Sequence, residues 1–229
     1  MSEAKDRIRS EKQKIREIPG TKKKIQYIWE YYKLWIIGIV ALVLFTGFSV
    51  NRYFFHAKDY WFYLLLNNTY ADVGTGSDFY DGYTEYAGYD LGEKEIVFNN
   101  TSYFDYGDSV TGNTYFESFV AYTETGTLDA ITMECDDLVE LGESGRLLDL
   151  DSQECSEIRE KYGDRYLYCR VTDEDGSEEM VAVGIDVSDS ALMEDYQVYS
   201  ESAAVGIGAG SQHLDAVLEF LDYLYEEDM

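Results

Sequence analysis

The residues of this chain that could do chemistry are its three cysteines, its two histidines and its 45 aspartates and glutamates. Neither His56 nor His213 stands in a motif that would make it the base for a Ser or Cys nucleophile. The chain also has no G-x-S-x-G, no H-E-x-x-H and no P-loop. So many carboxylates make acidic pairs inevitable, and pairing therefore does not indicate acid–base catalysis. We expect no enzymatic activity, no cofactor and no metal.

The cysteines leave two interpretations open. Three thiols, at Cys135, Cys155 and Cys169, cannot all pair within one chain. Cys155 and Cys169 could form a disulfide across a short loop, or all three could be buried and unreactive. None of their spacings fits a zinc site.

A Tyr-rich stretch is the other feature with binding potential. Aromatic rings on a loop surface can stack on sugar faces or hold cationic groups. Alternatively, these rings bury their bodies under a Gly-rich loop. The residues are Tyr70, Tyr80, Tyr83, Tyr86, Tyr89, Tyr103 and Tyr106.

An apolar stretch near the N-terminus determines how all of these residues lie relative to a membrane. Leu34–Val50, LWIIGIVALVLFTGFSV, holds seventeen residues without a charge. A helix needs ~20 residues to cross a hydrocarbon core of ~30 Å. Aromatic residues on both sides lengthen the stretch and favour the two membrane interfaces. We therefore expect one transmembrane helix that anchors the chain in the lipid bilayer.

Charge divides the chain at this stretch. Residues 1–33 carry ten Lys and Arg against five Asp and Glu, whereas residues 51–229 carry eight against forty. The positive-inside bias predicts a single-pass cell-membrane protein with a cytoplasmic basic tail (1–33), a signal anchor (34–55) and an extracellular acidic domain (56–229). A cleaved signal peptide is the alternative, but no clear cleavage site follows the stretch. The acidity of the outer domain argues against nucleic acid as a partner.

Strand and helix signals alternate along the outer domain. The segment 70–92 is expected to be irregular or a broken helix. Alternation of this kind indicates an α/β fold. The predicted strands are 60–67, 95–99, 128–133, 166–172, 180–185 and 203–207, and the clearest predicted helices are 114–122 and 213–225, with another begun by Asp136 and Asp137.

Three segments, taken in order, resemble the extracellular solute-binding proteins of bacterial ABC transporters. Gly126–Leu150 has the helix-ending glycine, an aspartate before an apolar strand and a G-x-L-x-x-L ending. Glu178–Leu192 resembles the strand that often reads Y-G-I-P in the family, with Asp186 in place of the proline. Ala203–Glu226 resembles the family's glycine-bearing strand followed by an amphipathic helix.

The resemblance implies a reduced periplasmic-binding-protein-like domain, because the outer part is much shorter than a two-lobed protein of this kind. In the related fold, ligands meet the loops at the carboxyl ends of parallel strands. The implied ligand-binding residues are Asn67, Asn68, Met133, Glu134, Asp136 and Asp186. Alternatively, these residues only cap the strand ends and contact solvent.

The expected function is capture or sensing of a small solute, such as a sugar or a peptide, by a membrane-anchored module. An ABC permease is a possible partner of such a module. The alternative is a membrane-anchored interaction or scaffold protein that keeps the fold without binding a ligand.

Overall fold

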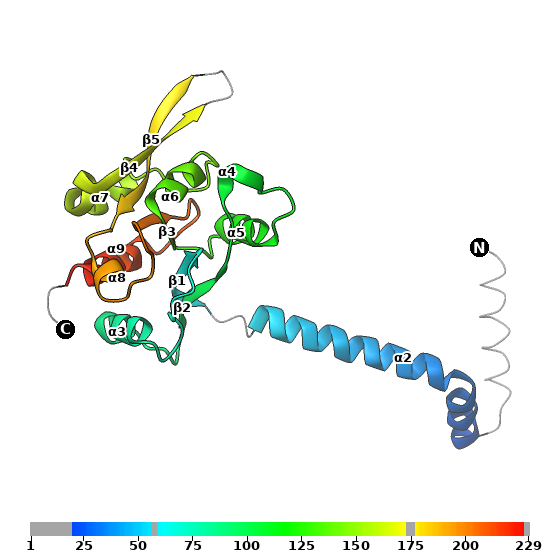
Figure 1. Cartoon of the computed structure of the whole chain (residues 1–229). Coiled ribbons are helices and arrows are strands. Elements are labelled where there is room, and N and C mark those ends of the chain that lie inside the picture. The colour runs from blue at the N-terminus through cyan, green and yellow to red at the C-terminus, as the bar shows by residue number, and fades with distance from the viewer. Residues whose placement is uncertain (1–19, 56–58, 173–176, 227–229) are drawn as a thin grey trace. The chain divides into compact units, whose positions relative to one another are not determined.

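The computed structural model describes residues 20–55, 59–172 and 177–226 (Figure 1). Contacts within the chain form two compact units, Met1–Ala57 and Lys58–Met229. The segment 173–176, between the predicted strands 166–172 and 180–185, lies outside the described residues.

The first unit contains helix α2 (Thr21–Phe55), which includes the whole predicted anchor. Within the described residues, no helix is both long enough and apolar enough to cross a membrane. The last two residues of the predicted span, Ser49 and Val50, have side chains outside the described part of the chain. The anchor therefore stays a prediction from the sequence.

The second unit is built on a six-stranded mixed sheet with the order β2-β1-β3-β6-β5-β4. β1 is parallel to both of its neighbours, and β6 is antiparallel to β3 and β5. β4 and β5 form an antiparallel hairpin, seen in yellow and orange in Figure 1. The strands are β1 (Tyr60–Asn67), β2 (Glu95–Ser102), β3 (Ala130–Met133), β4 (Tyr166–Thr172), β5 (Glu178–Asp186) and β6 (Ala204–Ile207).

The helices of the second unit connect these strands and cover the sheet. Its mixed α/β class agrees with the class expected from the sequence. The helices are α3 (Asp78–Ala87), α4 (Tyr106–Ser109), α5 (Thr114–Glu124), α6 (Cys135–Gly142), α7 (Ser156–Tyr162), α8 (Ala191–Glu194) and α9 (Leu214–Leu224).

Strand β1 is apolar from Tyr60 to Leu66 because both of its faces are buried. Phe62 and Leu64 belong to one hydrophobic core, whereas Tyr63 and Leu65 do not share it and lie in a second core. Successive side chains of a strand point to opposite faces, so the two cores lie on opposite sides of the sheet. A strand buried on both faces reads as a continuous apolar run, which explains YWFYLLLN.

Each core has its own helices. The first core receives Phe79 and Tyr83 from α3 and Phe220 from α9. The second core receives Phe119 from α5 and Leu138 from α6. The predicted apolar face of the last helix is confirmed, since Val217, Phe220, Leu221 and Leu224 are all buried.

Helix α6 approaches the sheet closely over two glycines. A Cβ atom at Gly184 of β5 would lie 2.3 Å from Leu138 Cδ2, and one at Gly206 of β6 would lie 2.9 Å from Leu138 Cδ1. The two glycines thus form the surface on which the Leu138 side chain rests. A Cβ atom at either position would collide with the end of the Leu138 side chain, which would have to shift.

The sequence predicted some elements better than others. The strands at 60–67 and 166–172 are confirmed at those bounds, and 95–99, 180–185 and 203–207 differ by one to three residues at an end. The strand predicted at 128–133 begins only at Ala130. Asp129 instead turns its side chain into the sheet, where Oδ2 accepts a hydrogen bond from the Tyr63 backbone N–H at 2.9 Å.

The Tyr-rich segment contains a regular helix, α3, that the glycines obscured. Ser77 caps its start by accepting the Tyr80 backbone N–H at 3.2 Å, and Gly88 ends it at φ 65°. Of the tyrosines, Tyr83 is fully buried whereas Tyr70 is 89 % exposed. The buried-body interpretation therefore holds for Tyr83 and not for Tyr70.

The cysteines are free thiols. Cys155 lies in the first core and Cys169 in the second, on the other side of the sheet. The alternative of a disulfide between them is wrong for this fold, because the sheet separates the two sulfur atoms.

Candidate functional site

The carboxyl ends of three strands lie at the same end of the sheet. β1 and β3 are parallel neighbours, and β5 runs in the direction of β3 because both are antiparallel to β6. We call this end of the sheet the strand-end site. Asn68, Glu134 and Asp186, three of the residues implied by the resemblance, follow or end these strands.

The loops that follow β1 and β3 leave this end of the sheet toward opposite faces. After β1 it continues to α3, whose Phe79 packs in the first core, and after β3 it continues to α6, whose Leu138 packs in the second. Neighbouring parallel strands whose following loops depart to opposite faces define a topological switch point. The strand-end site therefore lies at the topological switch point of the sheet.

Two adjacent asparagines hold one loop of the site. Asn67 Nδ2 donates to the Phe104 carbonyl at 2.8 Å, and Asn68 Nδ2 donates to the same oxygen at 3.1 Å. Asn68 Nδ2 also lies 2.6 Å from Asp105 Oδ1. Asn68 adopts φ 57°, a left-handed conformation that asparagine tolerates better than most residues. The pair fixes the segment after β2 against the end of β1.

The Asn67 side chain also has a hydrogen-bond acceptor without a partner. Its side chain is fully buried, and its Oδ1 is one of three buried side-chain polar atoms in the described residues without a hydrogen-bond partner. A second is the hydroxyl of Ser102, which stands opposite Asn67 in the β1–β2 register. An unsatisfied buried polar group costs about 1–3 kcal/mol. Both atoms lie at the carboxyl ends of their strands and have almost no exposed surface.

Carboxylates gather at the start of α6. Burial raises the pKa of the Asp137 carboxyl above its ordinary value, and the charges of Asp105 and Glu134 raise this pKa further. Glu140 adds to the same effect from the next turn of the helix. A raised carboxyl pKa means that negative charge is costly there, so the site favours a positively charged or proton-donating partner.

The remaining implied residues differ in their access to this site. Glu134 is half-buried, and its charge helps to raise the pKa of the buried Tyr199, whose hydroxyl donates to the Thr132 carbonyl at 2.7 Å. Asp136 is exposed. Met133 is fully buried in the second core, so its side chain supports the site from within the protein.

The Asp186 carboxylate is hydrogen-bonded to residues of its own loop. Its Oδ1 accepts the Ser188 backbone N–H at 2.9 Å and the Ser188 hydroxyl at 2.6 Å. Cys135 lies beside this turn, with Sγ 3.8 Å from Ser188 Oγ, and its backbone N–H donates to Ser202 Oγ at 3.1 Å. Burial raises the pKa of the Cys135 thiol, which keeps it protonated and poorly nucleophilic at neutral pH.

The structure adds residues that the sequence reasoning did not assign to a site. Asp105, Ser102 and Tyr199 reach the strand-end site from segments far away in the chain. Only Asp137 carried a local signal, because it stands beside Asp136 at the start of a predicted helix.

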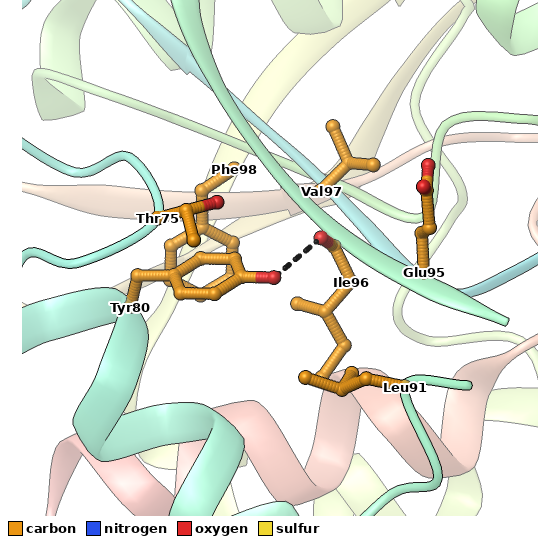
Figure 2. A pocket seen from close by; sticks show the side chains of 7 residues that line it. All are labelled: Thr75, Tyr80, Leu91, Glu95, Ile96, Val97 and Phe98. Carbon is orange, nitrogen blue, oxygen red and sulfur yellow. Dashed lines mark hydrogen bonds between the residues drawn. The ribbon is translucent and has the colours of Figure 1, made fainter.

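A separate cavity of about 340 Å³ lies beside β2 (Figure 2). Its walls are residues 95–98 of β2 together with Thr75, Tyr80 and Leu91. None of the ligand-binding residues implied by the resemblance lines this cavity. Tyr80 reaches across from α3, and its hydroxyl donates to the Ile96 carbonyl at 3.1 Å.

Neither region contains a recognisable metal centre. Over the described ranges, no group of three or more His, Cys, Asp or Glu side chains is arranged to hold a metal ion. Compared with family models, with curated proteins and with solved structures, the chain shows no match.

Proposed function

We propose that this chain is a membrane-anchored module whose acidic outer domain binds a small solute at the strand-end site. The observation that carries the proposal is the topology. β1 and β3 are parallel neighbours whose following loops run to opposite faces of the sheet. Open α/β sheets bind their ligands at such switch points.

The polar groups at the strand-end site support a binding role. Glu134 and Asp137 offer carboxylates, and Asn67 offers a buried carbonyl oxygen without a partner. Such groups suit the hydroxyls of a sugar or the amides and amino group of a peptide. A reduced relative of the solute-binding proteins of ABC transporters would use them to capture the solute or to present it to a permease.

The anchor is the second part of the proposal. Apolar side chains of α2 such as Leu34, Leu42 and Leu44 are 64–76 % exposed within the chain. The Thr46 hydroxyl donates to the Leu42 carbonyl at 2.8 Å, so this polar group is satisfied inside the helix, as a bilayer requires. The basic residues before this segment favour a cytoplasmic N-terminus and an extracellular domain.

A thermal-shift screen of the full-length chain in detergent micelles tests the binding proposal. The panel holds monosaccharides, disaccharides, short peptides and divalent cations. A ligand at about 100 times its Kd stabilises the folded state by about 2.7 kcal/mol, which raises the Tm of a domain of this size by several degrees.

Two variants locate the site. Glu134→Gln should abolish or strongly reduce the shift, whereas Glu157→Gln on the exposed start of α7 should leave it unchanged. If no member of the panel shifts the unaltered chain, the domain is better described as the alternative, a scaffold that keeps the fold without a ligand. A shift that Glu134→Gln leaves intact would place binding elsewhere.

A further inference from the structure

The outer edge of β2 carries main-chain groups that point away from the sheet. β2 is the outermost strand of the described sheet on this side. The Glu95 N–H donates to the Asp59 carbonyl on the β1 side at 3.0 Å. Because main-chain groups alternate between the two edges of a strand, Ile96 and Phe98 turn theirs outward. The Ile96 carbonyl confirms this direction, since it accepts the Tyr80 hydroxyl (Figure 2).

The cavity described above lies along this edge. Tyr80 and Thr75 border it from the α3 side, and Leu91, which is 44 % exposed, borders it from the loop before β2 (Figure 2). The cavity therefore places apolar side chains such as Leu91 beside the main chain of β2, and more of its surface is polar than apolar. An extended peptide that adds a strand to a sheet needs this combination, because its main chain bonds to the edge and its side chains enter adjacent pockets.

The two chain segments that contribute Thr75, Tyr80, Leu91 and Glu95 to the cavity are strongly acidic. The segments 72–81 and 90–95 contain six carboxylates and a single cationic residue, Lys94. Five of the six are exposed, whereas Glu95 is half-buried and already interacts with another group. The Lys94 ammonium lies 4.6 Å from the centre of the Trp61 ring, so an aromatic face already engages it. The border thus favours a ligand with positive charge.

We propose that the outer edge of β2 binds a short, extended, Lys- or Arg-bearing peptide by strand addition. The peptide main chain pairs with Ile96 and Phe98, and its basic side chains face the surrounding carboxylates. This site is distinct from the strand-end site and does not depend on solute binding there. A second copy of this chain is disfavoured as the occupant, because two β2 edges would bring the same carboxylates together.

Binding of the synthetic peptide Ac-KVTVK-NH2 to the full-length chain in micelles tests the proposal. Isothermal titration calorimetry gives the affinity, and hydrogen exchange with mass spectrometry reports on the amides of β2. Binding should slow exchange in the fragment containing Ile96 and Phe98. Two matched peptides should bind at least about tenfold more weakly, namely Ac-EVTVE-NH2 and a KVTVK peptide N-methylated at alternate residues.

Three variants of the protein sharpen the test. Leu91→Arg places a positive charge in the cavity and should weaken binding by about tenfold or more. Met180→Arg makes the same charge change at an exposed position of β5 and should leave the affinity unchanged. Tyr80→Phe releases the Ile96 carbonyl for the peptide and should tighten binding by about threefold, the worth of a modest hydrogen bond.

Several results would overturn the proposal. Equal affinity for the N-methylated peptide would mean that charge alone, without strand addition, holds the ligand. Equal affinity of Leu91→Arg and Met180→Arg would place the peptide elsewhere. Self-association that Leu91→Arg abolishes, together with no binding of KVTVK, would assign the edge to a second copy of the chain. Loss of solute binding in Glu134→Gln leaves the peptide result unaffected, so the two proposals fail independently.

Discussion

The Oδ1 atom of Asp129 lies 3.1 Å from Nδ1 of His213, although 84 residues separate the two in the chain. Asp129 is fully buried, and its two oxygens also accept the Ser211 hydroxyl at 2.8 Å and the Tyr63 backbone N–H at 2.9 Å. One carboxylate thus connects the start of β3, the middle of β1 and the residue that precedes α9. It holds the end of the sheet opposite to the strand-end site.

Replacing this carboxylate should cost much of the stability of the domain. Asp129→Ala leaves the buried Tyr63 N–H without an acceptor, and we expect a loss of about 2–4 kcal/mol in the free energy of unfolding. His213→Gln removes only a 40 % exposed partner and should cost less than about 1 kcal/mol. Urea denaturation followed by circular dichroism measures both values. Similar losses in the two variants would contradict the central role of Asp129.

The contact of Leu138 with two glycines gives a second prediction. Gly184→Ala should destabilise the domain by about 1–3 kcal/mol, because the new methyl group collides with the Leu138 side chain. Gly74→Ala is the matched control, since the nearest atom there is 4.0 Å away, and it should change stability by less than about 1 kcal/mol. In a double-mutant cycle, Leu138→Ala should remove most of the cost of Gly184→Ala. Additive losses would argue against the collision.

The carboxylates around Asp137 predict a variant that is more stable than the natural chain. The pKa of Asp137 is raised, so at neutral pH its charge disfavours the folded state, and this cost disappears as the pH falls through that pKa. Asp137→Asn should therefore stabilise the domain at pH 7 by about 0.5–1 kcal/mol, a modest value because the site is partly solvated.

The pH dependence of this gain is its control. The difference between Asp137→Asn and the unaltered chain should shrink at pH 4 and in 1 M salt, which screens exposed charges. Glu157→Gln should show no such pattern. A destabilised Asp137→Asn at pH 7 would mean that hydrogen bonds of the carboxylate outweigh the repulsion. The same variant should weaken solute binding, since function often retains groups that lower stability.

Alkaline pH should unfold the domain through its buried phenols. Burial raises the pKa of Tyr63 to about 12, although a hydrogen bond from Asn99 lowers it. The unfolded chain loses this proton near pH 10, so the stability contributed by the neutral phenol is complete below pH 10 and is lost between about pH 10 and 12. Burial also raises the pKa of Tyr83 and Tyr199.

Tyr63→Phe tests this dependence. Between pH 9 and 12 the unaltered chain should lose stability more steeply than Tyr63→Phe, by about 2–3 kcal/mol over the range. The absorbance of tyrosinate measures ionisation, and urea denaturation at each pH measures stability. Tyr70→Phe, at an 89 % exposed position, should keep the steep loss of the unaltered chain. Parallel curves for all three proteins would contradict the prediction.

The predicted anchor can be tested in cells. The full-length chain should remain in the membrane pellet after carbonate extraction, whereas a chain that begins at residue 56 should be released. Protease added to intact cells should remove the domain at 56–229, because the positive-inside bias places it outside. Extraction of the full-length chain would refute the anchor, and protection of the domain would refute its orientation.

The sequence predicted what local patterns determine. The run at 60–67 is apolar on both faces, so its strand could be placed from length and composition alone. The face of α9 followed from its helical spacing. The strand predicted at 128–133 begins two residues late, at Ala130, because the partner of the Asp129 carboxylate, the Tyr63 N–H, lies 66 residues away in the chain. Likewise, Asn68 is hydrogen-bonded to Asp105, which lies 37 residues away in the chain, and no local pattern indicates this contact. The cavity beside β2 depends on how α3 packs, which the glycines of 70–92 concealed.

The order of strands in the sheet also bears on how the chain matures during synthesis. β6, at residues 204–207, is the last strand to be made, yet it lies between β3 and β5. The parallel strands β2-β1-β3 and the β4–β5 hairpin thus remain two separate pieces until β6 has left the ribosome. The nascent chain exposes the β3 and β5 edges throughout this interval, and such edges invite mispairing and chaperone binding.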